Sequence, residues 1–107
     1  MEYINKVTLQ GKVGAIRLNE IQGHKVASFS VSTELVSLNA YGQLMAELTW
    51  HQVCAWDGEN ICDLTRLRKG DEVRVSGRIR NTRYTSADGT EKTFTEVLAS
   101  ELSIINE

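Results

Sequence analysis

The chain has 107 residues, of which 41% are hydrophobic and 24% charged, with a net charge of −2; this composition suits a single globular domain spanning residues 1–107. No apolar run approaches the roughly 20 residues of a membrane helix, and the first residues, MEYINKVTLQ, lack a signal pattern. These features argue against a membrane partner and predict a cytoplasmic protein.

Five stretches with turn residues between them read as strands. In chain order they are residues 4–18, 25–35, 47–56, 71–80 and 92–105. Most of them alternate apolar and polar side chains with a period of two, which is typical of half-buried strands. Gly11 and Gly14 interrupt the first stretch, and glycine inside a strand predicts a bulge or bend.

Residues 57–70 break this alternation. Ile61, Leu64 and Leu67 are spaced at three, which predicts a helix capped by Asp57 and ended by Gly70. The resulting order, three strands, one short helix and two strands, predicts an all-β fold: the five-stranded Greek-key barrel of the OB-fold. The face formed by strands two and three of that fold, with its connecting loops, binds oligonucleotides or oligosaccharides.

The third stretch holds both tryptophans, in LTWHQVCAWDG (48–58). Residues an even number apart lie on one side of a strand, so Trp50, Gln52, Cys54 and Trp56 share a face. Two interpretations stay open, because the tryptophans can belong to the core or to a surface that stacks on unpaired bases. Cys54 and Cys62 lack a CxxC pair or a histidine cluster, so we expect reduced, half-buried thiols, no metal site and no cofactor.

The net charge conceals a local basic stripe. Residues 66–83 contain seven cationic side chains and two carboxylates, whereas the rest of the chain has five cations and twelve carboxylates. In the fourth stretch Val73, Val75, Gly77 and Ile79 point one way, and Arg74, Ser76, Arg78 and Arg80 point the other. Arginines at alternate positions stand about 7 Å apart, close to the phosphate spacing of an extended single strand. The alternative interpretation is an ordinary solvated face.

A hairpin is expected at residues 81–92, because Asp88–Gly89 is a turn signal. It carries Arg83 and Tyr84 near its base, a cation and an aromatic ring suited to a flexible polymer. The candidate stacking residues are therefore Trp50, Trp56 and Tyr84, and the candidate phosphate contacts are Arg74, Arg78, Arg80, Arg83, Lys6 and Lys12.

These segments resemble the bacterial single-stranded DNA-binding proteins over residues 3–105. The resemblance is carried by NKVTLQGKVG, ASFSVST, TWHQVCAW, LRKGDEVRVSGRIR and YTSADGTEKTFTEV, in that order. It implies an OB-fold that binds single-stranded DNA without sequence preference in replication, recombination and repair. It also implies stacking roles for Trp50, Trp56 and Tyr84, and a homotetramer, with a dimer as the alternative. In such an assembly the first strand pairs with its copy in another subunit, and His51 lies near a subunit contact.

The chain departs from the family pattern in two places. A further stacking tryptophan is usual after the second strand, but residues 33–47 have Ser37 and Leu38 near that point, so this platform is lost or replaced by Tyr41. The family usually continues into a disordered tail with an acidic end that recruits partners. This chain stops at SIINE, so that either a tail has been removed or the protein is a naturally short relative, such as a phage or mobile-element version; tail-mediated partners are not expected of the chain as it stands.

Two other functions remain open at this point. One is an adaptor similar to primosomal replication protein B. The other is a protein–protein adaptor whose basic strand meets an acidic partner and whose exposed aromatics act as hot spots. Enzyme activity is not expected and no catalytic residue is assigned, because the carboxylates are scattered and no phosphate-cradling glycine loop occurs.

Overall fold

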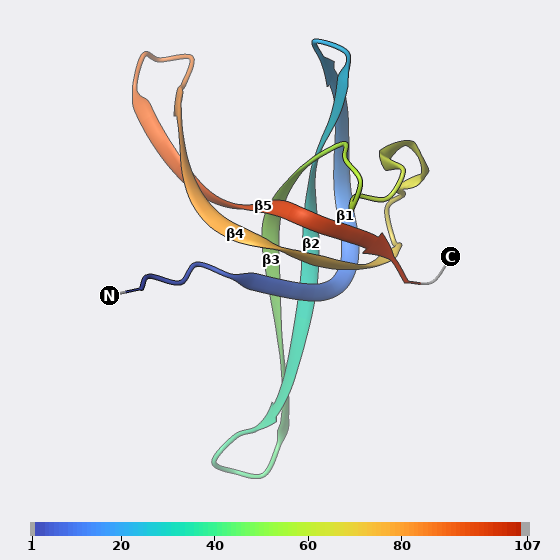
Figure 1. The fold of residues 1–107 in the computed structure, drawn as a ribbon. Helices are drawn as coiled ribbons and strands as arrows, with labels where there is room; N and C mark the ends of the chain where they lie inside the picture. Colours follow the sequence, from blue (N-terminus) through green and yellow to red (C-terminus); the bar gives the residue numbers. More distant parts are fainter. Residues whose placement is uncertain (1, 106–107) are drawn as a thin grey trace.

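The computed structural model describes residues 2–105 as a five-stranded closed barrel (Figure 1). The elements are β1 (Val7–Ile21), β2 (His24–Leu38), β3 (Leu44–Trp56), the one-turn 3-10 helix η1 (Leu64–Arg66), β4 (Glu72–Thr85) and β5 (Glu91–Ile104). Around the barrel the order is β1-β2-β3-β5-β4, and the β3–β5 pair is parallel whereas the other pairs are antiparallel. The predicted OB-type barrel is confirmed. Helical structure in residues 2–105 is too short and too polar to cross a membrane.

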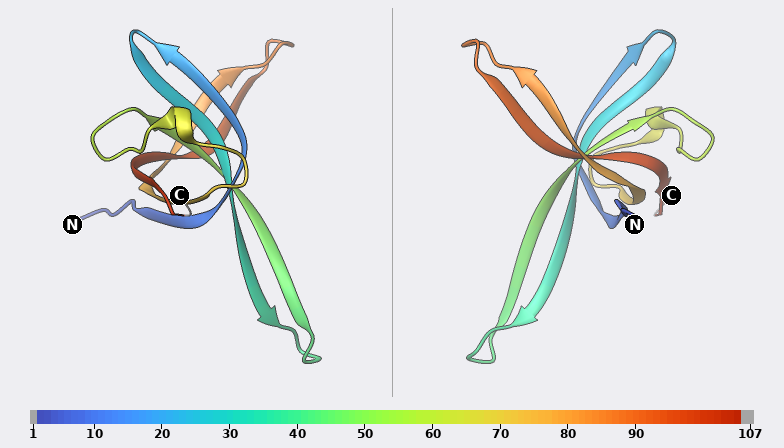
Figure 2. Two further views of the ribbon diagram at one scale, coloured as in Figure 1. Left: turned by 90° about the vertical axis from the view of Figure 1, so that its right-hand side faces the viewer. Right: turned by 60° about the vertical axis from the view of Figure 1, so that its left-hand side comes forward.

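Three hairpins project from the barrel, and they are longer than the sequence pattern predicted. In Figure 1 the β1–β2 and β4–β5 hairpins extend upward and the β2–β3 hairpin extends downward, and Figure 2 shows the three arms spreading from a common centre. The β2–β3 ladder runs as far as the pair Leu38 and Leu44. Its turn is held by Asn39, whose Oδ1 accepts hydrogen bonds from the amides of Tyr41 and Gln43.

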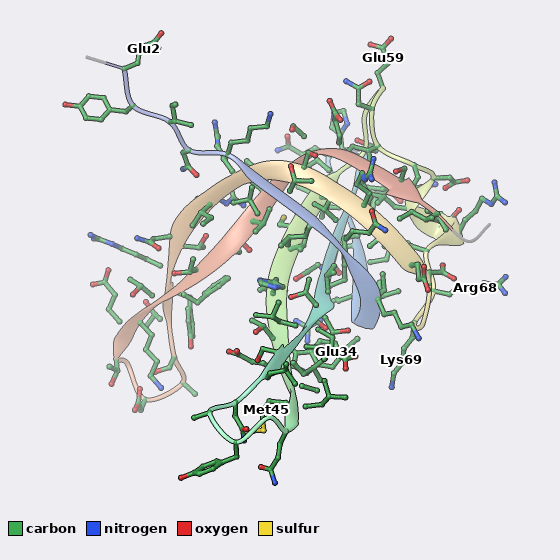
Figure 3. The ribbon with its side chains drawn as sticks, turned by 90° about the horizontal axis from the view of Figure 1, so that it is seen from below. Glu2, Glu34, Met45, Glu59, Arg68 and Lys69 are labelled. Atoms are coloured by element: carbon green, nitrogen blue, oxygen red, sulfur yellow. The ribbon has the colours of Figure 1, made fainter. Side chains whose placement is uncertain are left out.

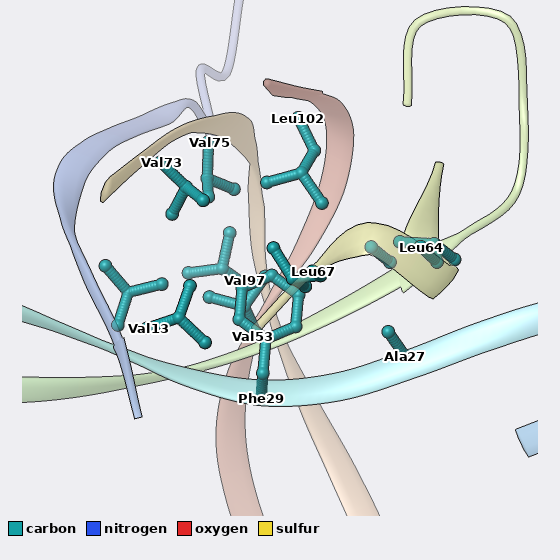
Figure 4. Close-up of a cluster of buried hydrophobic side chains, with 12 residues drawn as sticks. Val13, Ala27, Phe29, Val53, Leu64, Leu67, Val73, Val75, Val97 and Leu102 are labelled. Carbon is teal, nitrogen blue, oxygen red and sulfur yellow. The ribbon is translucent and has the colours of Figure 1, made fainter. Parts of the chain in front are cut away.

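Inward-facing side chains of the strands fill the barrel (Figure 4). Phe29, Val53 and Val75 are almost completely buried, and each lies between polar or exposed residues along its own strand. Burial of alternate residues is the reason that these segments form strands rather than helices. Leu64 and Leu67 cover one end of this cluster.

The helix expected over residues 57–70 is wrong in extent and in its cap. Only η1 is helical, and Asp63 caps it by accepting a hydrogen bond from the Thr65 amide. The backbone on either side of Ile61 pairs with β5 instead, because the Cys62 amide donates to the Leu102 carbonyl. Those hydrogen bonds are incompatible with a helix through the same residues.

Asp57 has a different role from the predicted cap. Its Oδ2 accepts a hydrogen bond from the Lys25 amide, and its Oδ1 lies 3.2 Å from His24 Nδ1. The Lys25 amide, and to a lesser degree His24, hold the pKa of this carboxyl below its usual range. Asp57 therefore ties the end of β3 to the start of β2.

Candidate nucleic-acid interface

Both tryptophans lie on the outer face of β3. Val53 and Ala55, on the opposite side of the strand, are completely buried in the barrel, whereas Trp50 is 57% and Trp56 40% exposed. Since neighbouring residues of a strand alternate between its faces, Gln52 and Cys54 lie between the two rings on this outer side. Of the two positions left open for the tryptophans, the core and the surface, the structure has the surface position.

Trp50 lies across β2 against a bulge in β1. The β1–β2 register shifts between Val13 and Ile16, as the glycine at position 14 predicts. A Cβ placed on Gly14 would stand 2.7 Å from Cζ3 of Trp50 and 2.5 Å from Oγ of Ser30. The absence of a side chain at Gly14 therefore leaves the space that the indole ring occupies.

Tyr84 is paired with an aromatic side chain that the sequence analysis did not identify. Phe94 of β5 contacts Tyr84 edge to face, with ring centroids 5.7 Å apart. Both rings are partly exposed. They line an open groove together with three polar side chains: Ser28, Gln52 and Thr95. Phe94 could have been found by counting residues outward from the predicted Asp88–Gly89 turn. The resulting β4–β5 register puts Phe94 diagonally opposite Tyr84 on the same face.

Arg80 is half-buried and is bound by a buried carboxylate. Glu96 Oε1 accepts hydrogen bonds from Arg80 Nε at 2.8 Å and from Thr82 Oγ1 at 2.9 Å. Burial, and next the charge of Glu96, raise the pKa of the neighbouring Cys54 thiol, while Arg80 opposes this through its charge and a side-chain hydrogen bond. The guanidinium is thus held by Glu96.

The other arginines of β4 differ in their surroundings. Arg74 Nη2 donates to Gln10 Oε1 at 3.1 Å on the β1–β4 pair. Arg83 Nη1 lies 3.6 Å from Glu91 Oε1, on the opposite face of the β4–β5 hairpin from Tyr84. Arg78 is exposed and makes no side-chain hydrogen bond or ion pair within residues 2–105.

The two candidate lysines are exposed but lie in different places. Lys12 pairs with Ser32, which pairs with Trp50, so these three side chains form one row across the outer face. Lys6 lies just before β1, beside the β4 residues that pair with it. The structure therefore groups Lys12 with the tryptophan face and leaves Lys6 just outside the β1–β4 pair, near its Val7–Gly77 end.

Tyr41 lies at the turn of the β2–β3 hairpin and is 88% exposed. Figure 3 shows Met45 near the end of that hairpin, and Glu34 closer to the barrel.

His51 belongs to the inward row of β3, where its Nε2 is 2.8 Å from Thr33 Oγ1. In residues 2–105 no group of three or more His, Cys, Asp or Glu side chains could hold a metal ion.

Comparison with known proteins gives a consistent result. The model of the Single-strand binding protein family matches residues 4–105. The mitochondrial single-stranded DNA-binding protein of Drosophila melanogaster is 33% identical over 102 residues, covering 92% of this chain and 69% of the relative. The single-stranded DNA-binding protein of Neisseria meningitidis is 30% identical over 108 residues, covering 95% of this chain, which spans only 60% of that relative.

Solved structures have the same architecture. The Plasmodium falciparum SSB, solved in complex with ssDNA, superposes with a TM-score of 0.83 at 29% identity, covering 99% of this chain and 98% of that one. A deletion mutant of the single-stranded DNA binding protein from Thermus aquaticus gives a TM-score of 0.76 at 20% identity, over 96% of this chain and 51% of that one. The second likeness concerns the fold alone.

Proposed function

This chain belongs to the single-strand binding protein family, and from that premise we propose that it binds single-stranded DNA without sequence preference. The observation that carries the proposal is the outer face of β3, where Trp50 and Trp56 stand exposed while their strand neighbours are buried. Aromatic rings that stack on unpaired bases contribute about 1–3 kcal/mol per base, whatever the base.

The bases stack on Trp50, Trp56 and Tyr84, with Phe94 supporting the ring of Tyr84. The backbone of the strand follows the exposed cations at the edges of this surface. Lys12 is suited to this role by its row with Trp50, and Arg78 by its lack of a protein partner within residues 2–105. Arg83, Arg74 and Lys6 extend the path if the DNA strand continues around the barrel.

In a cell this activity protects exposed single strands during replication, recombination and repair, and it requires no catalysis. We propose that the chain acts as a single domain, in the cytoplasm, and as a homotetramer, with a dimer as the alternative. Exposed apolar side chains support association: Tyr3 and Ile4 near the N-terminus are 90% and 87% exposed, and Leu35 and Met45 of the β2–β3 hairpin are at least half exposed. Light scattering of the free protein tests the assembly.

The first test of function is a titration with oligo(dT), followed by tryptophan fluorescence at two salt concentrations. Quenching that weakens with salt is expected, since stacking alters the tryptophans and phosphate contacts release counterions. An absence of both quenching and binding at low salt would overturn the proposal. The surface would then be a protein-docking face, for which the apolar Leu38 and Leu44 of the β2–β3 hairpin are the first candidates.

A further inference from the structure

Glu96 is an unusual residue for a surface that binds a polyanion. It is the only buried charged side chain in residues 2–105, with 6% exposure. Its neighbour Val97 faces the core, so Glu96 points to the outer side of β5, where it lies two residues from Phe94. A buried carboxylate therefore lies on the same face of β5 as Phe94, next to the groove that the aromatic rings line.

The contacts of Glu96 tie it to one arginine. Arg80 is its direct cross-strand partner, and the Nε–Oε1 distance of 2.8 Å is that of a charge-assisted hydrogen bond. Because the carboxylate is shielded from water, its attraction for the guanidinium is stronger than that of a surface pair. The side chain of Arg80 is 39% exposed, so the guanidinium is held by Glu96 while part of the side chain stays accessible to solvent.

The same hairpin offers a pair of the opposite kind. Arg83 and Glu91 are 79% and 65% exposed, and their nearest atoms are 3.6 Å apart. Water and salt screen such a pair, so the two charges act almost independently. Arg83 keeps most of its attraction for an approaching phosphate, whereas the positive charge of Arg80 is offset from within the protein.

We propose that Glu96 is an internal counter-charge that keeps Arg80 from acting as a phosphate contact. This inference rests on the proposed function and deepens it. It assigns the floor of the groove to bases, which meet Tyr84 and Phe94, and leaves the phosphates to cations at the rim. As a consequence, the affinity for single-stranded DNA should depend less on salt concentration than the number of arginines in β4 would suggest.

The test measures oligo(dT) affinity as a function of salt concentration, for the wild type and three variants. Each phosphate that a protein cation neutralises on a single strand contributes roughly 0.7 to the slope of log affinity against log salt. Glu96→Gln keeps the size of the side chain and its acceptor oxygen for Arg80 Nε, but removes the charge. We expect its slope to steepen by about 0.7 and its affinity at low salt to increase.

Two further variants make the result specific. Glu91→Gln removes the same charge from the same hairpin, next to an arginine that is already available, and its slope should stay close to that of the wild type. The double variant Arg80→Gln, Glu96→Gln replaces the ion pair by a neutral pair of equal net charge and similar shape. Its slope should also equal that of the wild type, because Arg80 contributes no phosphate contact while Glu96 is charged.

The inference is overturned if the double variant loses about 0.7 of slope, since Arg80 would then contact a phosphate despite Glu96. It is also overturned if Glu91→Gln and Glu96→Gln steepen the slope equally, since the effect would be one of overall charge. Thermal unfolding of each variant checks that the barrel persists, and the neutral pair gives a result even where one single variant is unstable. Failure of the wild type to bind oligo(dT) would instead refute the proposed function.

Discussion

The outer face of β3 carries aromatic side chains and that of β4 carries arginines, the two kinds of side chain proposed to bind single-stranded DNA. The two faces differ in how far these side chains already contact other protein groups. On β3 the rings of Trp50 and Trp56 are left exposed. On β4 Arg80 is bound to Glu96 at 2.8 Å and Arg74 to Gln10 at 3.1 Å, whereas the exposed Arg83 is only weakly paired, 3.6 Å from Glu91. From this difference we predict that stacking contributes more to binding at this surface than charge does.

Removing a tryptophan should have the largest effect. Trp50→Ala and Trp56→Ala should each weaken oligo(dT) binding by about 1–3 kcal/mol, or roughly 5- to 150-fold, because one stacking platform is lost. The salt slope should change little, since no phosphate contact is removed. Titrations at four salt concentrations, followed by a labelled oligonucleotide, measure both quantities.

The control for this prediction is a check that the variants still fold into the barrel. Circular dichroism and thermal unfolding should show Trp50→Ala and Trp56→Ala to be folded, since both rings lie outside the core. Trp56→Phe should retain most of the affinity, because a phenyl ring also stacks. Unfolding of Trp56→Ala would mean that the ring supports the barrel. It would contradict the view that the rings on β3 are free to stack on bases.

A smaller loss is expected at Gly14, which touches no DNA in this scheme. In Gly14→Ala the new Cβ would meet Ser30 Oγ at 2.5 Å and Trp50 Cζ3 at 2.7 Å; the Ser30 hydroxyl can rotate away, whereas the indole ring must move from its place over β1. We expect a loss of affinity that is smaller than that of Trp50→Ala and absent when Trp50 is already alanine. Equilibrium titration of the two single variants and the double variant measures this coupling.

Gly58→Ala provides the matched control, because a Cβ at Gly58 would be no closer than 3.9 Å to Ile61 and its backbone is not left-handed. It should bind like the wild type. Equal effects of Gly14→Ala in the presence and absence of the Trp50 ring would show that the bulge, rather than the indole, responds to the substitution.

The fold and the faces of the strands could be predicted from the sequence because both depend on a period of two. Burial of Val53 beside exposed Trp50 follows from that alternation. What could not be predicted depends on pairing between distant segments. The short η1 results from the pairing of Ile61 with Leu102, and no pattern within residues 57–70 holds information about that pairing. The Arg80–Glu96 pair, in contrast, could have been found, like Phe94, by counting from the hairpin turn.

Among the arginines, Arg78 should contribute more than Arg74. Arg78→Gln should reduce the salt slope by roughly 0.7, because Arg78 is exposed next to the groove strand β5 and is not engaged by a protein group within residues 2–105. Arg74→Gln should leave the slope nearly unchanged, since Arg74 lies on the β1–β4 pair beside Gln10. Salt titrations of the two variants test this, and a larger effect at Arg74 would mean that the strand crosses β1.

The smallest effect is the pH dependence of the turn that joins β4 and β5, the strands that carry Tyr84 and Phe94. Hydrogen bonds from the Ser86 hydroxyl and the Thr90 amide lower the pKa of Asp88 to about 2. A carboxyl whose pKa is depressed on folding stabilises the fold above its ordinary pKa of about 4, and that contribution disappears as the pH falls to about 2. The Thr90 amide proton should therefore shift in nuclear magnetic resonance spectra with a midpoint near 2, and should lose this transition in Asp88→Asn. A midpoint near 4 would mean that the carboxylate does not hold the turn. The aromatic pair on β4 and β5 would then lack the anchoring that Asp57 gives to the Trp56 end of β3.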